Sequence, residues 1–363
     1  MKIAVVGASG FVGSRLVEML HLGEEHSVRP VVRSVGSLSR VCRFALDYAI
    51  AEVSNEEALV KAFQGVDVVV HTALGNPDEI ERGVETVYRA CCRSGVKRMV
   101  YLSSASVHGQ APAAGTDEST PLSDKQSIDY NNWKVRAEWR LARIRAKGNV
   151  ETVILRPGIV YGPRDRWMTH MADQLLADRA FVLNEGSGIC NSIYVDNLIH
   201  AISLAFTAPG VDREAFLVGD AEVVTWMDMF ACVADFLGVS RHSIRPGRPR
   251  QEQRSLMNKL DAVRSLAFSQ RVLKLAPARG KRAGKAMIAG WFQQPITTNW
   301  DDTVKEDNSV PLEMALLYQC EYKLPYDKAA AMLNYQPAVT FEEACRRSLG
   351  ALEFMGYTKR LSA

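Results

Sequence analysis

A glycine-rich turn lies between a short apolar run and a helical apolar pattern at the start of the sequence. Residues 2–6 (KIAVV) can form a buried parallel strand, and Gly7, Gly10 and Gly13 follow directly. Gly7 allows a tight turn, Gly10 lets the backbone approach a pyrophosphate, and Gly13 lets helix and strand pack closely. The free N–H groups at the start of the helix then face the phosphates. The arrangement predicts a dinucleotide-binding turn, against the alternative of an ordinary glycine turn, with contacts from Gly7, Ser9, Gly10, Phe11, Val12 and Gly13.

Apolar runs alternate with helical patterns over the first 160 residues. Strand-like runs occupy residues 28–32, 66–71, 96–102 and 150–156, and helical patterns occupy residues 58–63, 84–92 and 130–147. Such alternation indicates βαβ units in a parallel sheet. We therefore predict an α/β fold with a doubly wound parallel sheet, the Rossmann architecture, and a smaller C-terminal substrate lobe. The dinucleotide-binding domain is expected to span residues 1–165, with residues 189–206 returning to it, and residues 166–363 are expected to form mainly the lobe.

The composition excludes several classes of protein. Of 363 residues, 47% are hydrophobic and 23% are charged, which is typical of a globular protein and not of a disordered or fibrous one. No apolar run approaches the roughly 20 residues of a membrane-spanning helix. Seven cysteines are scattered without metal-ligand spacing, and the sequence enters its first strand without a secretion leader. We expect reduced thiols, no metal site and a cytoplasmic location.

Residues 241–285 form a basic segment that stands out from the rest of the chain. It carries thirteen Lys or Arg residues against two acids, Glu252 and Asp261. Leu256, Leu260 and Val263 recur there at helical spacing. Three interpretations are open: a cap whose arginines hold a diphosphate, a helix packed on the sheet domain, and peripheral contact of residues 241–292 with an anionic membrane. Nucleic-acid binding is disfavoured because no series of stacking aromatic residues is interleaved with the cations.

A tyrosine and a lysine four residues apart form the second chemical motif. Tyr130 and Lys134 lie in a helical pattern, twenty-six residues after Ser104. Residues at positions i and i+4 share a helix face, so the ammonium can lie beside the phenol. A nearby cation is expected to lower the pKa of the tyrosine and make it a usable acid or base. A surface helix pair is the alternative interpretation.

Together these motifs resemble the extended short-chain dehydrogenase/reductase family. The glycine spacing, the Ser104–Tyr130–Lys134 set and the block at residues 156–163 (RPGIVYGP) follow its order, and the resemblance covers residues 1–240 and 327–354. It implies that Tyr130 is the catalytic acid/base, that Lys134 holds the cofactor ribose, and that Ser104, rather than Ser103, binds the substrate oxygen. It also implies a homodimer, and it adds cofactor contacts at Glu52, Val53, Thr72, Ala73, Tyr130, Lys134, Pro157, Gly158 and Val160.

Departures from the family pattern narrow the expected reaction. Relatives that dehydrate sugars carry a pair of carboxylates just after the position of Ser104, and relatives that epimerise and reduce deoxysugars carry a cysteine at the position of Ser106. This sequence has Ala105 and Ser106 there, so both reactions are disfavoured. Ketone reduction, alcohol oxidation and epimerisation through a keto intermediate remain. His108 replaces the usual tyrosine; it either contacts substrate or packs under the active-site loop, and packing is favoured. The candidate substrate contacts are Ser106, His108, Arg164 and Asn191.

The end of the second strand bears on the choice of cofactor. NAD sites place an acidic residue there, whereas this sequence has Arg33, which can bind a 2′-phosphate, so NADP is favoured over NAD. The leading substrate class is a sugar nucleotide or a related alcohol or ketone. The alternatives are a reductase of hydrophobic ketones, similar to the hydroxysteroid and dihydroflavonol branch, and a non-catalytic NADP-binding regulatory protein.

Overall fold

The structure is a computed structural model that describes residues 1–250 and 308–358. It contains two compact units, one of Met1–Gly247 with Glu313–Ala363 and one of Arg248–Leu312. In the described part of the second unit, β12 (Arg248–Pro249) pairs in parallel with β13 (Ser309–Val310). All further elements given below belong to the first unit, apart from the first residue of α11.

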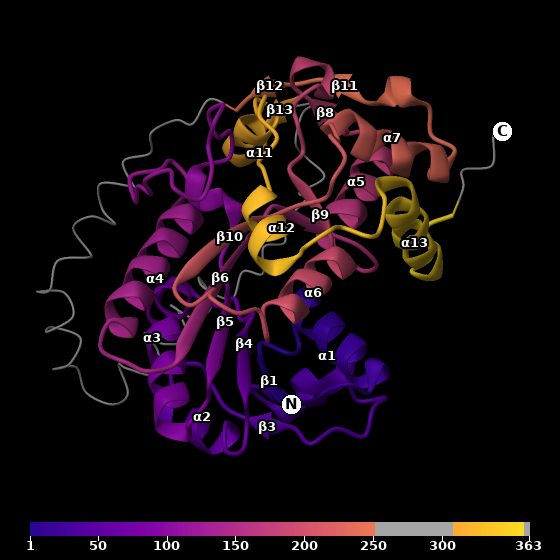
Figure 1. The fold of residues 1–363 in the computed structure, drawn as a ribbon. Helices are drawn as coiled ribbons and strands as arrows, with labels where there is room; N and C mark the ends of the chain where they lie inside the picture. Colours follow the sequence, from indigo (N-terminus) through magenta and orange to yellow (C-terminus); the bar gives the residue numbers. More distant parts are fainter. Residues whose placement is uncertain (251–307, 359–363) are drawn as a thin grey trace, which may run out of the picture. The chain divides into compact units, whose positions relative to one another are not determined.

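A seven-stranded sheet is the centre of the first unit (Figure 1). All of its strand pairs are parallel, in the order β10-β6-β5-β4-β1-β2-β3. The chain order reverses between β1 and β4, which opens a crevice at the carboxyl ends of these strands. The strands are β1 (Lys2–Val6), β2 (Ser27–Val32), β3 (Ala49–Ile50), β4 (Val68–His71), β5 (Arg98–Leu102), β6 (Glu151–Pro157) and β10 (Glu214–Val218).

Helices cover both faces of this sheet (Figure 1). Because side chains alternate along a strand, Ile3 and Val5 of β1 pack in one core cluster and Ala4 and Val6 pack in another. The first cluster is covered by α1 (Phe11–Gly23), α6 (Val195–Leu204) and α12 (Asp327–Leu333), and the second by α2 (Glu56–Ala62), α3 (Pro77–Ser94) and α4 (Asp129–Arg145).

Smaller elements complete the unit. β7 (Ile159–Tyr161) pairs with β9 (Ser192–Tyr194), and β8 (Phe181–Val182) pairs with β11 (Arg245–Pro246). Short 3-10 helices occur at η1 (Val35–Arg40), η2 (Ala105–His108), η3 (Asn184–Gly186) and η4 (Arg241–Ser243). The remaining helices are α5 (Arg166–Leu176), α7 (Trp226–Leu237), α11 (Leu312–Leu317) and α13 (Phe341–Phe354).

The predicted doubly wound parallel sheet is confirmed, and the predicted strands and helices overlap the observed ones, although α3 begins at Pro77, well before the predicted start at residue 84. Two strands of the seven-stranded sheet were not anticipated. β3 has only two residues, and β10 lies beyond the part of the sequence where strands and helices alternate regularly. β10 pairs with β6 although it lies in the range assigned mainly to the lobe. The boundary at residue 165 stays a prediction.

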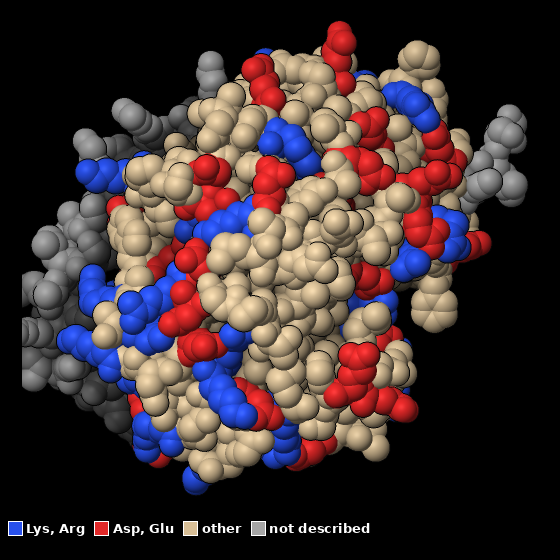
Figure 2. Space-filling model, viewed as in Figure 1, with Lys and Arg blue, Asp and Glu red and all other residues tan. Residues whose placement is uncertain are grey.

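Most of the basic segment lies outside the described residues, including the apolar positions from Leu256 onward. At its described start, Arg241 pairs with Asp235 and Arg245 with Asp178. Figure 2 shows acidic and basic side chains mixed over the face in view. No helix in the described ranges is long and apolar enough to cross a membrane, and no described group of His, Cys, Asp and Glu could hold a metal ion. The cap, membrane and dimer interpretations stay predictions.

The close approach of β1, α1 and β4 gives the first testable prediction. A Cβ atom on Gly13 would lie 2.2 Å from the Gly7 carbonyl oxygen and 2.8 Å from Thr72 Oγ1. Gly13→Ala should therefore force the turn apart and lower the free energy of unfolding by about 1–3 kcal/mol, as overpacking does. Urea unfolding of Gly23→Ala, a position in α1 with nothing within 4 Å, is the matched control. Equal stabilities of the two variants would contradict this packing.

Candidate active site

The residues predicted to act on cofactor and substrate gather at the carboxyl ends of the parallel strands. Gly7 follows β1, Arg33 follows β2, Thr72 follows β4 and Ser104 follows β5 by two residues. Pro157 is the last residue of β6. Because parallel strands all end at one edge of a sheet, these side chains share one crevice.

The glycine turn has the features that a pyrophosphate needs. Gly7 has φ of +88°, and a Cβ there would lie 2.6 Å from the Ala73 backbone. Gly10 is the N-cap of α1, and no side chain caps the helix. The first N–H groups of α1, at Phe11 and Val12, therefore remain available to an anion. The structure brings the glycine turn and Thr72–Ala73 together, and Thr72 Oγ1 donates a 3.0 Å hydrogen bond to the Val6 carbonyl.

The side chains expected around the adenosine lie where β2 and β3 end. Arg33 is exposed, and within the described residues its guanidinium has no hydrogen-bond or ion-pair partner. Glu52 is exposed as well, and Val53 packs against Gly83 of α3. An arginine with no partner among the described residues can receive a phosphate bidentately. The cradle and this arginine together fit a dinucleotide.

Ser104, Ser106 and Tyr130 form a hydrogen-bonded group. The Ser106 hydroxyl donates to Ser104 Oγ at 2.9 Å, and the Ser104 hydroxyl lies close enough to the Tyr130 phenol to act on its pKa. Ser103 turns the other way and donates to Glu138 Oε1 at 2.5 Å. Ser104 is therefore the serine that lies beside the tyrosine, and its contact with the substrate oxygen stays a prediction.

The pKa of Tyr130 differs from the sequence-based expectation. Burial raises it to about 12, although the hydrogen bond to Ser104 opposes that rise. Lys134 Nζ lies 6.0 Å from the centroid of the Tyr130 ring and donates to the Leu102 carbonyl at 2.9 Å. The expected lowering by the lysine is therefore wrong for the protein alone, because burial disfavours the charged phenolate. Tyr130 is a protonated phenol at neutral pH.

Lys134 is almost fully buried at the base of this group. Its Nζ lies 3.4 Å from the Tyr101 hydroxyl, and burial lowers the pKa of Lys134 to about 8, partly opposed by the charge of Glu138. His71 packs against Tyr101, with its pKa lowered to about 3 by burial and by Lys134. The lysine therefore stays mostly charged near neutrality, while His71 is neutral.

A buried ion pair joins α4 to β6 beneath the site. Arg156 donates to both oxygens of Glu138, at 3.1 and 2.7 Å, and both side chains are about 5% exposed. Arg156 Nη1 also lies 3.2 Å from His108 Nε2. Because a guanidinium only donates, His108 accepts at Nε2. Burial and Arg156 lower the pKa of His108 to about 4, which favours a neutral, packed histidine.

Asn191 holds the C-terminal segment against the site. Its Nδ2 donates to the Tyr322 carbonyl at 3.0 Å, and its Oδ1 accepts from the Leu324 N–H at 2.8 Å. A Cβ atom on Gly158 would lie 1.9 Å from the Asn191 carbonyl oxygen. The polar atoms of Asn191 are thus already engaged, and its contact with substrate stays a prediction.

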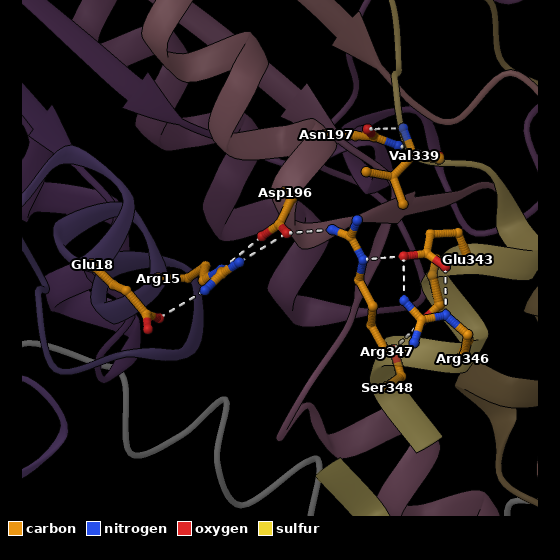
Figure 3. A network of polar contacts seen from close by, with 10 residues as sticks. Arg15, Glu18, Asp196, Asn197, Val339, Glu343, Arg346, Arg347 and Ser348 are labelled. Atoms are coloured by element: carbon orange, nitrogen blue, oxygen red, sulfur yellow. Dashed lines mark hydrogen bonds and ion pairs between the residues drawn. The ribbon is translucent and has the colours of Figure 1, made fainter. Parts of the chain in front are cut away.

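Arg164 lies in a cationic cavity away from Tyr130. The cavity measures about 230 Å³ and is also lined by Arg15, Arg40 and Arg347. Figure 3 shows Asp196 bonded to Arg15 on one side and to Arg347 on the other, at 2.7 and 3.4 Å. Asp196 thereby connects α1, α6 and α13. The structure does not bring Arg164 together with the Ser104–Tyr130 group.

Two residues near the site were given no role by the sequence, although Glu138 follows Lys134 there as it does in the family that the sequence resembles. Glu138 lies four residues after Lys134, so helical spacing could have placed it on the same face. Glu313 contributes a charge that raises the pKa of Tyr130, although it lies far away in the sequence. No spacing rule connects it to the tyrosine.

Glu138 carries a prediction about stability. Glu138→Ala leaves the guanidinium of Arg156 buried and unpaired, which should cost about 3–5 kcal/mol of the free energy of unfolding. Glu343→Ala breaks pairs with Arg346 and Arg347 on the surface and should cost much less. Urea denaturation of both variants measures the difference. Equal losses would show that the buried pair does not hold α4 to β6.

Comparison with known proteins identifies the family. The model of the 3-beta hydroxysteroid dehydrogenase/isomerase family matches residues 4–221. The 3beta-hydroxysteroid-dehydrogenase/decarboxylase isoform 1 of Arabidopsis thaliana is 26% identical, over 97% of this chain and 79% of that protein. The 3 beta-hydroxysteroid dehydrogenase/Delta 5-->4-isomerase of Mycobacterium tuberculosis is 30% identical, over 65% of this chain and 70% of that protein.

A solved structure shares the fold. The UDP-glucuronic acid 4-epimerase of Bacillus cereus, in complex with UDP-glucuronic acid and NAD, superimposes with a TM-score of 0.68 over 98% of this chain and 100% of that chain, at 17% identity. The predicted resemblance to extended short-chain dehydrogenase/reductases, NAD(P)-dependent oxidoreductases and epimerases, is confirmed. Within that group, the chain belongs to the 3-beta hydroxysteroid dehydrogenase/isomerase family.

Proposed function

We propose that the protein transfers hydride between a nicotinamide dinucleotide and a hydroxysteroid or a related hydrophobic alcohol or ketone. The observation that carries this proposal is the placement of the Ser104 hydroxyl and the Tyr130 phenol beside the buried Lys134, at the end of β5 and on the adjoining face of α4. The family match favours the hydrophobic substrate class over the sugar nucleotide that led the sequence analysis. A bound dinucleotide would supply or accept the hydride.

Ser104 and Tyr130 would hold the oxygen of the substrate. Tyr130, with its pKa near 12, is protonated at neutral pH and can donate its proton to a carbonyl oxygen as that oxygen gains charge. This state suits ketone reduction. In alcohol oxidation the phenol must first lose its proton, so that direction should become faster as pH rises. Lys134 would bind the ribose hydroxyls and bring positive charge to the phenol.

Glu138 would keep Lys134 charged and in place. Its carboxylate raises the pKa of Lys134 against the effect of burial, and its two bonds to Arg156 fix the rotamer of the glutamate. One carboxylate would therefore fix the position of α4 and also keep the lysine charged. The role is one of support, because Glu138 lies beneath the site.

The expected cofactor is NADP. Arg33 has no partner among the described residues, and Ser34 lies next to it at the start of η1. An NAD site would instead carry an acid that accepts from the ribose 2′-hydroxyl. The unpaired guanidinium would bind a 2′-phosphate through charge-assisted hydrogen bonds.

Tyr130→Phe tests the catalytic role directly. The variant keeps the ring but loses the proton donor, so kcat for reduction of a 3-ketosteroid should fall roughly 10²–10⁴-fold. Affinity for NADPH, measured by calorimetry, should change little. Near-normal turnover would refute the assignment of Tyr130. Turnover by neither the variant nor the wild type, with intact NADPH binding, would instead favour the non-catalytic regulatory protein.

Arg33→Ala tests the cofactor preference. The change removes the charge that would pair with the 2′-phosphate, so affinity for NADPH should fall about 10-fold or more. Affinity for NADH, which lacks that phosphate, should stay nearly constant. Arg89→Ala, which alters an exposed arginine of α3 that has no partner among the described residues, is the matched control. Tighter binding of NADH than of NADPH by the wild type would reverse the preference.

A further inference from the structure

The side-chain amide of Asn191 makes three hydrogen bonds to one short stretch of the C-terminal part of the chain. Its Nδ2 donates to the Tyr322 carbonyl at 3.0 Å and to Cys320 Sγ at 3.3 Å. Its Oδ1 accepts from the Leu324 N–H at 2.8 Å. A backbone carbonyl only accepts and an N–H only donates, so an amide can serve both, whereas a carboxylate cannot donate. Asn191 thus holds residues 320–324, which we call the strap.

The backbone of Asn191 lies on the cofactor side of the crevice. Its carbonyl oxygen accepts from the Ile159 N–H at 2.7 Å. A Cβ atom on Gly158 would lie 1.9 Å from the same oxygen, so the two backbones are in contact. Pro157 and Gly158 are the residues expected to line the nicotinamide. Asn191 therefore connects the expected nicotinamide site to the strap.

Two further contacts fix the strap. The Ile189 N–H donates to the Cys320 carbonyl at 2.7 Å. Lys323 Nζ lies 3.5 Å from the position that a Cβ atom on Gly219 would take, directly after β10. The strap is therefore attached both to the segment that carries Asn191 and to the end of β10.

The apolar side chains of the strap pack beside the serine of the site. Leu324 lies in a buried cluster with Ala105 and Leu217, and Tyr322 packs against that cluster. Ala105 directly follows Ser104, and consecutive Cα atoms are about 3.8 Å apart. Tyr322 is only partly buried, which leaves some of its surface available to a ligand. The strap thus presents an aromatic side chain next to the residue that would bind the substrate oxygen.

We propose that Asn191 is a positioning residue, which holds Tyr322, backed by Leu324, as an apolar wall against the body of the substrate. The inference rests on the proposed function and specifies how the site selects a hydrophobic ketone or alcohol, since contact with the wall removes apolar surface from water. Because Asn191 also contacts Gly158, the wall has a fixed position relative to the expected nicotinamide.

The variant Asn191→Asp tests this role. It keeps the size of the side chain and an acceptor for the Leu324 N–H but cannot donate to the Tyr322 carbonyl, so the strap should shift. The probes are a 3-ketosteroid and cyclohexanone, whose single ring offers far less surface to the wall. We expect KM for the steroid to rise about 10-fold with kcat nearly unchanged, because apolar contact is binding energy shared by ground state and transition state.

The same variant should change KM for cyclohexanone and affinity for NADPH by no more than about twofold, because neither depends on an extended apolar contact. Asn149→Asp is the matched control, since Asn149 is exposed and precedes β6, at the end of the strand away from the site. It should change none of these values. A purely structural role of Asn191 would lower the free energy of unfolding without distinguishing the two ketones.

Tyr322→Ala removes the wall and leaves the bonds of Asn191 to the backbone of the strap intact. It should raise KM for the steroid about as much as Asn191→Asp does. The double variant should add no more than about twofold, because two residues that act through one contact are not additive. Fully additive effects, or equal rises in KM for both ketones, overturn the proposal.

Failure of the proposed function gives a different result. If the wild type reduces neither ketone, calorimetry with the NADP⁺-loaded enzyme still measures the binding of the steroid. Weaker binding by both Asn191→Asp and Tyr322→Ala, with Asn149→Asp unchanged, supports the wall and refutes only the reaction. Unchanged binding in the two variants, or no binding of the steroid by the wild type, overturns the wall.

Discussion

The buried carboxylate of Glu138 is the interaction on which the arrangement of the site depends. It accepts from Ser103 after β5 and from Arg156 of β6, while α4 carries it one turn below Lys134. Three elements from separate parts of the sequence are thereby held at one point. Because both charges of the pair are removed from water, the loss of either partner leaves an expensive unpaired charge. The positions of Ser104, Tyr130 and Lys134 follow from this arrangement.

Burial of the side chains at the site also determines their pKa values. It raises the pKa of Tyr130, lowers the pKa of Lys134 and keeps His71 neutral. The tyrosine is consequently an acid at neutral pH in the protein alone. Its conversion into a base requires positive charge close to the phenol, which Lys134, bonded to the Leu102 carbonyl, provides only at a distance. This balance favours a site that protonates a substrate oxygen.

The sequence alone predicted the elements whose structure depends on neighbouring residues in the chain. The buried strands appear as continuous apolar runs, and the glycine turn has its strand before and its helix after it. β10 was missed because five residues in an irregular region carry no pattern of their own, and pairing with β6 defines them. Ser104 lies beside Tyr130 and its role stays a prediction, whereas the pKa of Tyr130 differs from the expectation because helical spacing says nothing about desolvation. Glu313 could not be predicted, because tertiary structure alone brings it to the site.

The central claim is that Ser104, Tyr130 and Lys134 mark the point where a nicotinamide dinucleotide and a ketone meet. A crystal structure of the enzyme with NADP⁺ and a 3-ketosteroid tests it most directly. The account predicts the pyrophosphate at the start of α1, the nicotinamide ribose bonded to Lys134 Nζ, and the steroid oxygen within hydrogen-bond distance of Ser104 and Tyr130. A dinucleotide bound elsewhere, or a steroid oxygen held away from Tyr130, would contradict it.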